Sequence, residues 1–266
     1  MWLLWFRTLL SGIVLMAPSL RRSELPRLRA LLTSSRDMVQ FIIFSICGLL
    51  AVQLTYFLAI SNGNAVSATI LQYLSPLILT VFVAVKAMHL PSTKEISTLV
   101  LAVSGTALLL TDGHFGTMVV PKTAVYWGLA SACFSAFYTY YPVQLIRKHG
   151  SQVVLGTGLL FGGLLLTPFE LTKSFPPITT ETILLLAFIV LFGSALSFHL
   201  YLGSLARLAP VEAILLASAE PISAAIVGVG FLAAPFGPIA LIGGVLTLFA
   251  VTSVAVGERK PNKLDE

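Results

Sequence analysis

Long apolar segments separated by short polar turns occupy almost the whole sequence. A helix that crosses the hydrocarbon core of a bilayer needs about 20 consecutive, mostly apolar residues. Hydrophobic residues make up 57% of the chain and charged residues only 10%, whereas a soluble domain carries about 25% charged residues. We therefore expect an all-α polytopic membrane protein with about nine transmembrane helices. These helices are predicted over residues 2–20, 39–60, 65–86, 95–111, 123–146, 152–170, 182–204, 210–232 and 236–257.

Basic residues fall mostly on one side of this arrangement. Cytoplasmic loops are enriched in Lys and Arg, so the arginine-rich loop after the first span is placed inside. Successive loops then lie on alternate sides of the membrane. Of the Lys and Arg residues, only Lys122 and Lys173 fall outside, while Arg7 lies within the first span. No basic residue precedes that span, which argues against a secretory signal peptide. The sequence thus predicts a multi-pass protein of the cell (plasma) membrane, with its N-terminus outside and a cytoplasmic C-terminal tail, residues 258–266.

Several other classes of protein are disfavoured by composition. The net charge of +5 is spread along the chain, which does not indicate nucleic-acid binding. Cys47 and Cys133 lie in apolar stretches without metal-ligand spacing, and we expect them to be buried and free of disulfide or metal. No GxSxG, phosphate-binding loop or paired His/Asp/Glu cluster occurs. An enzyme, a cofactor and a metal site are therefore not expected.

Glu220 is the most conspicuous ionisable residue. Between Pro210 and Leu232 the only ionisable residues are Glu212 and Glu220, and Glu220 lies near the middle of the segment. A charge inside a bilayer is costly and usually marks a pathway or a substrate site. Glu220 is interpreted as a proton or cation site, or as a contact to a substrate's amino group. The alternative is a protonated structural carboxyl bonded to a neighbouring serine.

Two stretches of the chain resemble each other. Residues 48–76 align without gaps with residues 193–221, and both form an expected helix, a short turn, a second helix and a proline. The alignment pairs Gly48 with Gly193, Tyr56 with Tyr201 and Pro76 with Pro221. Low identity leaves chance as an alternative. The two copies run in opposite directions in the predicted topology, as in the inverted repeats of many secondary transporters.

The chain also resembles the EamA-type members of the drug/metabolite transporter superfamily. The resemblance rests on WFRTLLSGIVLM in the first helix, on the run from Phe57 to Pro76, and on YLGSLARLAPVEAILLASAEPISAAIVG with its Glu-Pro pair. It implies an inverted repeat of a five-helix unit, with this chain similar to helices two to ten. The expected domains are an incomplete first repeat, 1–114, and a second repeat, 122–257. The missing first helix is expected to reflect either a misplaced start or a shortened member.

Polar residues inside the predicted spans are the candidates for contacts to a substrate. Ser197 and Tyr201 share one face of their helix, as do Gln53 with Tyr56 and Gln72 with Ser75. An amide in hydrocarbon must find hydrogen-bond partners, so these residues face protein or water. Packing between helices is the alternative. The substrate-binding candidates are Glu220, Tyr201, Ser197, Gln53, Tyr56, Gln72, Ser75 and Tyr138, and Pro76 and Pro221 are predicted helix kinks.

Two functions remain open from the sequence. The first is a secondary transporter of small polar metabolites such as amino acids, exporting them by alternating access across the lipid bilayer. Proton coupling through Glu220 is an added hypothesis, and a homodimer is an added expectation. The second is a non-transporting or inactive truncated membrane paralogue or scaffold, which the missing first helix favours.

Overall fold

The computed structural model of the chain is helical and contains no strand among the residues that it describes. These are residues 2–19, 24–86, 93–114, 120–170, 179–208, 210, 213, 217 and 237–257. The chain divides into two compact units. Unit 1 contains Met1–Phe57 and Phe137–Pro210, and unit 2 contains Leu58–Ala136 and Val211–Glu266. Each unit therefore takes segments from both of the repeats predicted from sequence.

Local sequence determines where several helices begin. Ser34 accepts a hydrogen bond from the backbone N–H of Asp37 at 3.4 Å and so caps the next helix. Asn64 caps its helix in the same way at 2.9 Å, and Thr179 does so at 3.2 Å. A side-chain oxygen at this position satisfies one of the backbone donors that a helix start leaves open. These three polar residues therefore mark where new helices begin.

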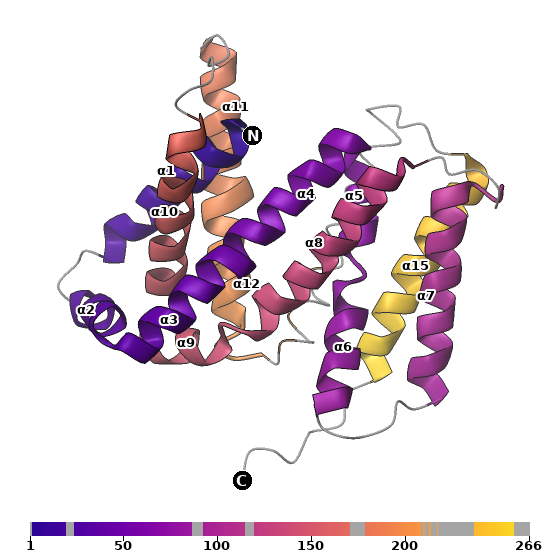
Figure 1. The fold of residues 1–266 in the computed structure, drawn as a ribbon, viewed down its shortest axis with the longest axis horizontal. Coiled ribbons are helices and arrows are strands. Elements are labelled where there is room, and N and C mark those ends of the chain that lie inside the picture. Colours follow the sequence, from indigo (N-terminus) through magenta and orange to yellow (C-terminus); the bar gives the residue numbers. More distant parts are fainter. Residues whose placement is uncertain are drawn as a thin grey trace. The chain divides into compact units, whose positions relative to one another are not determined.

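In unit 1 the most closely packed pair of helices is α1 and α10, which lie against each other (Figure 1). Two glycines allow this close approach. A Cβ on Gly12 would lie 2.5 Å from the backbone nitrogen of Leu160, and one on Gly163 would lie 2.8 Å from Cα of Leu9. Small residues at helix interfaces serve the same purpose in membrane proteins generally. The helices of unit 1 are α1 (Trp2–Ser19), α2 (Leu25–Thr33), α3 (Ser35–Ile43), the π-helical segment η1 (Phe44–Leu50), the start of α4 (Ala51–Asn62), the end of α8 (Lys122–Tyr140), α9 (Val143–His149), α10 (Ser151–Glu170), α11 (Thr180–Val190), the π-helical segment η2 (Leu191–Leu196) and α12 (Ser197–Ser204).

Unit 2 is organised around a second close pair, α7 (Thr93–Thr111) and α15 (Pro238–Gly257). The two helices meet where a Cβ on Gly105 would lie 2.7 Å from the backbone nitrogen of Thr247. At one end Asp112 accepts a hydrogen bond from the backbone N–H of Ala240, in the first turn of α15, at 2.7 Å. The other helices of unit 2 are α5 (Ala65–Gln72), α6 (Ser75–Lys86) and the remaining parts of α4 and α8.

Four continuous helical stretches among the described residues are long and apolar enough to cross a membrane: Ser35–Asn62, Ala65–Lys86, Ser151–Glu170 and Thr180–Ser204. Shorter apolar helices cover Trp2–Ala17, Val100–Thr111 and Pro238–Ala250. The predicted span 210–232 lies almost wholly outside the described residues. An all-helical protein with several apolar helices is thus confirmed, and the count of about nine stays a prediction.

Two local features differ from the expected layout. The predicted first loop contains the helix α2, although its composition indicated a polar connection. The predicted span 123–146 is divided, because α8 ends at Tyr140 and α9 begins at Val143. Pro142 lies in this break, and its ring nitrogen cannot donate the backbone hydrogen bond that would continue α8.

Many large apolar side chains are exposed on the outer faces of the helices. Only 17% of the most apolar window of Thr180–Ser204 is buried, and Leu184 and Phe188 are among the exposed residues. Such a surface suits lipid and not water. The expectation that Cys47 and Cys133 are buried is wrong, since both are exposed. In a bilayer an apolar side chain needs no place in the protein interior, because lipid tails are equally apolar.

Candidate functional site

Arg7 is the single charged residue of the apolar helix α1. Its guanidinium Nη2 donates a hydrogen bond to Oε1 of Gln53 on α4 at 2.5 Å. The amide nitrogen of Gln53 donates in turn to the backbone carbonyl of Leu49, in η1, at 2.9 Å. Gln53 is buried. Since a donor and an acceptor of the same amide are both used, the Gln53 side chain is fixed and presents its oxygen to the cation.

Two phenylalanine rings lie against the Arg7 guanidinium. Its central carbon is 5.0 Å from the ring centroid of Phe57 on α4 and 6.0 Å from that of Phe198 on α12. The negative faces of aromatic rings attract a cation, and the planar guanidinium is weakly hydrated. Arg7, Gln53, Phe57 and Phe198 are named here the arginine cluster. It holds a positive charge inside an otherwise apolar region of unit 1.

A stack of aromatic rings continues from the arginine cluster. The ring of Tyr138 lies edge-on to Phe198 at 6.2 Å, and it forms stacked pairs with Phe44 and with Tyr201, each at 5.9 Å. The hydroxyl of Tyr201 lies 2.8 Å from Oγ1 of Thr139, so one of the two donates to the other. Helices α1, α4, α8 and α12 thus contribute to a single group of cationic, amide, aromatic and hydroxyl side chains within unit 1.

Two of these helices follow directly after π-helical segments. η1 lies directly before α4, and η2 lies directly before α12. Single π-helical turns shift the side chains that follow and are frequent at functional sites. Gly48 and Gly193, which the sequence alignment pairs, lie one in each segment. The same alignment pairs Gln53 with Phe198, and both contact Arg7.

The predicted site residues of unit 1 separate into two groups. Gln53, Tyr138 and Tyr201 are brought together by the arginine cluster and its aromatic stack. Tyr56 is half-buried, and its ring meets Phe57 edge-on at 6.3 Å. Ser197 is exposed, and its hydroxyl donates to the backbone carbonyl of Phe192 at 2.6 Å. The structure therefore gives Ser197 a local role in η2.

The predicted residues of unit 2 lie on α5 and α6. The amide nitrogen of Gln72 donates to the hydroxyl of Ser131 on α8 at 2.9 Å, a bond between two helices. Ser75 is buried at the start of α6, and Pro76 is the second residue of that helix. The helix is interrupted directly before, because Pro76 has no N–H to donate to the Gln72 carbonyl. Glu220 and Pro221 lie outside the described residues.

Sequence reasoning left several members of this group off the candidate set. Arg7 is absent from the substrate-binding candidates, although a lone arginine in an apolar helix is itself an indication of function. Phe57, Phe198 and Phe44 carry no such indication, since phenylalanine is common in every predicted span. Whether one of these phenylalanines joins the group depends on which face of its helix turns toward Arg7.

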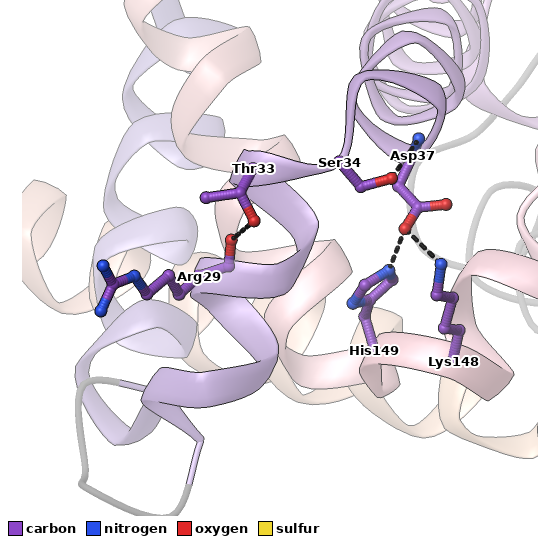
Figure 2. Close-up of polar contacts among 6 residues, drawn as sticks. All are labelled: Arg29, Thr33, Ser34, Asp37, Lys148 and His149. Atoms are coloured by element: carbon purple, nitrogen blue, oxygen red, sulfur yellow. Dashed lines mark hydrogen bonds and ion pairs between the residues drawn. The ribbon is translucent and has the colours of Figure 1, made fainter.

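A second polar cluster lies at one end of unit 1 (Figure 2). Oδ2 of Asp37 accepts from Nζ of Lys148 at 2.6 Å and lies 3.0 Å from Nε2 of His149. Asp37 is in the first turn of α3, and the two basic residues are in the last turn of α9. Acids near helix starts and bases near helix ends are favoured by the helix dipole. This cluster fastens α3 to α9. Among the described residues no group of His, Cys, Asp and Glu has the arrangement of a metal site.

Comparison with known proteins identifies relatives over most of the chain. Residues 1–111 and 122–256 match the EamA-like transporter family. The chain is 33% identical over 256 residues to a Salmonella typhimurium (strain LT2) protein described as "Uncharacterized inner membrane transporter YicL", covering 96% of this chain and 84% of that protein. A solved crystal structure shares the fold with a TM-score of 0.67 at 20% identity, covering 96% of this chain and 86% of that one.

Proposed function

The chain belongs to the EamA-like transporter family of the drug/metabolite transporter superfamily, and on this premise we propose that it is a secondary transporter exporting small polar metabolites such as amino acids. Family membership supports a membrane transporter and not an enzyme. The proposed mechanism is alternating access. In inverted-repeat transporters one part rocks against the other around a fixed binding site, and the inverted repeat predicted here would suit this motion.

The arginine cluster carries the proposal for the substrate. A guanidinium offers several N–H donors in one plane, which matches the two oxygens of a carboxylate. Gln53 takes one of these donors, while Phe57 and Phe198 lie against the guanidinium. Low-dielectric surroundings strengthen the attraction between the cation and an anionic group. We assign Arg7 the role of contacting the carboxylate of the transported molecule.

The other candidates have subordinate roles in the proposal. Tyr138 and Tyr201 supply aromatic surface and a hydroxyl next to the arginine cluster, suited to the uncharged part of a metabolite. Glu220 is proposed, from the sequence, as a proton or cation site that couples export to an ion gradient. Gln72, Ser75 and Tyr56 stay candidates on the same basis.

A counterflow assay in proteoliposomes tests the proposal. Amino acids and the corresponding decarboxylated amines are compared as competitors of a labelled substrate. We expect amino acids to compete and amines to fail. Arg7→Lys keeps the charge but removes the planar fork. Loss of a charged hydrogen bond costs about 1.5–3 kcal/mol, so we expect apparent affinity to fall roughly 10- to 150-fold.

A control variant tests whether changing a basic residue outside the arginine cluster also lowers transport. Lys122→Gln removes one exposed cation at the start of α8, outside the arginine cluster. Its transport should equal that of the unchanged protein. Equal competition by amines and amino acids would refute carboxylate recognition by Arg7. Absence of counterflow with every metabolite tested would instead contradict transport itself and favour the scaffold interpretation.

A further inference from the structure

The short helix α2 lies across one end of unit 1. Figure 1 shows α2 nearly end-on, whereas α1 and α10 run along the plane of the picture. α2 contacts α3 and α9 and buries Leu28 and Leu31 against the unit. A proline near its start and the Ser34 cap of α3 at its end define its limits. α2 is therefore a packed helix at the end of the bundle.

One side of α2 carries apolar and basic side chains together. Leu25 and Leu32 are 41% and 46% exposed, and Arg29 between them is also exposed. These three residues follow the i, i+4, i+7 spacing that places side chains on one helix face. Leucines flanking an arginine are typical of helices that lie in the membrane interface, with apolar chains in lipid and the charge at the headgroups. We name Leu25, Arg29 and Leu32 the interfacial face.

Basic residues predominate among the described residues at this end. Arg36 in the first turn of α3 and Arg147 in the last turn of α9 are exposed. The two acids nearby that the structure describes already have partners: Glu24 is paired with Arg27, and Asp37 is bound to Lys148 and His149. Figure 2 shows the Arg29 side chain pointing away from the Asp37 cluster. Positive charge is therefore left for an external anion.

We propose that the interfacial face of α2 docks on the bilayer surface and that Arg29, with Arg36 and Arg147, binds the phosphates of anionic phospholipid headgroups. The span Ser35–Asn62 starts directly after α2, which places the helix at headgroup depth. Anionic surfaces attract basic residues next to transmembrane helices. Leu25 and Leu32 supply the apolar contact, and the arginines select negative lipid. This interaction is independent of the transported substrate.

Spin-label accessibility tests the orientation of α2. The full chain carries Cys47→Ser and Cys133→Ser, and single cysteines replace Leu25, Leu32 or Ala30 in nanodiscs. Ala30 is the control, because it is exposed on the side of α2 away from the interfacial face. We expect labels at positions 25 and 32 to collide with oxygen dissolved in lipid, and the label at 30 with a water-soluble nickel reagent. Equal accessibility of all three labels to the nickel reagent would overturn docking.

Lipid retention tests the choice of headgroup. The protein is equilibrated with phosphatidylcholine alone or mixed with phosphatidylglycerol, delipidated gently, and its bound lipid measured by mass spectrometry. We expect preferential retention of phosphatidylglycerol and a loss of about fivefold for each of Arg29→Gln and Arg36→Gln. Lys122→Gln, which removes a cation in unit 2, should leave retention unchanged. If both arginine variants keep normal retention while their thermal stability is normal, the headgroup site is refuted.

Discussion

Replacing Gln53 by leucine removes two hydrogen bonds from the arginine cluster, one from the Arg7 guanidinium and one to the Leu49 carbonyl. A hydrogen bond to a charged group contributes about 1.5–3 kcal/mol in proteins generally. Hydrogen bonds between membrane helices average about 0.6 kcal/mol, with a maximum near 1.7, because the unfolded chain in lipid also finds partners. The 2.5 Å distance between Arg7 and Gln53 and the burial of Gln53 place the energy of this bond toward the upper end of the range for membrane helices. We expect a coupling of about 1–1.5 kcal/mol.

A double-mutant cycle isolates that coupling from the other effects of each substitution. Arg7→Met, Gln53→Leu, the combined variant and the unchanged protein are unfolded reversibly in mixed micelles, and the free energies of unfolding are compared. Gln152→Leu is the control, because the Gln152 amide donates a hydrogen bond to the Leu15 carbonyl, near the opposite end of α1 from Arg7. It should be additive with Arg7→Met. A coupling free energy between Arg7 and Gln53 below about 0.3 kcal/mol lies within the usual additivity error. Such a value would refute the claim that their hydrogen bond stabilises the protein.

Three further changes test the packing around the site. Gly12→Val should block the packing of α1 on α10, because a Cβ at position 12 would lie 2.5 Å from the backbone nitrogen of Leu160. Gly193→Ala is the control and should fold normally, because a Cβ there has no atom within 4 Å. Size-exclusion chromatography should give a monodisperse peak for Gly193→Ala and not for Gly12→Val. Asp112→Ala should lower the unfolding free energy by about 1 kcal/mol through loss of the α15 cap, and an unchanged melting temperature would contradict that capping role. Tyr201→Phe should lower the unfolding free energy by about 1 kcal/mol, because it removes the hydrogen bond to Thr139 and keeps the aromatic ring. A larger effect on transport than on stability would indicate that the Tyr201 hydroxyl contacts the substrate.

The helices themselves could be predicted from the sequence because a span has a length requirement that hydropathy meets directly. Polar residues that are costly in lipid also stand out in an apolar segment. Gln53, Tyr138 and Tyr201 are candidates for this reason, and the same argument applies to Arg7. The interruption before Pro76 follows from its missing N–H and needs no tertiary information.

Which face of each helix turns inward was decided only by the tertiary structure. In a soluble protein an apolar stripe marks the buried face, but lipid is as apolar as a protein core, so a spanning helix is hydrophobic all round. The exposure of Cys47 and Cys133 has this cause. The sequence by itself determined an all-helical membrane protein of this transporter family. The pairing of Arg7 with Gln53 depends instead on how each helix is rotated about its axis and on contacts between distant parts of the chain.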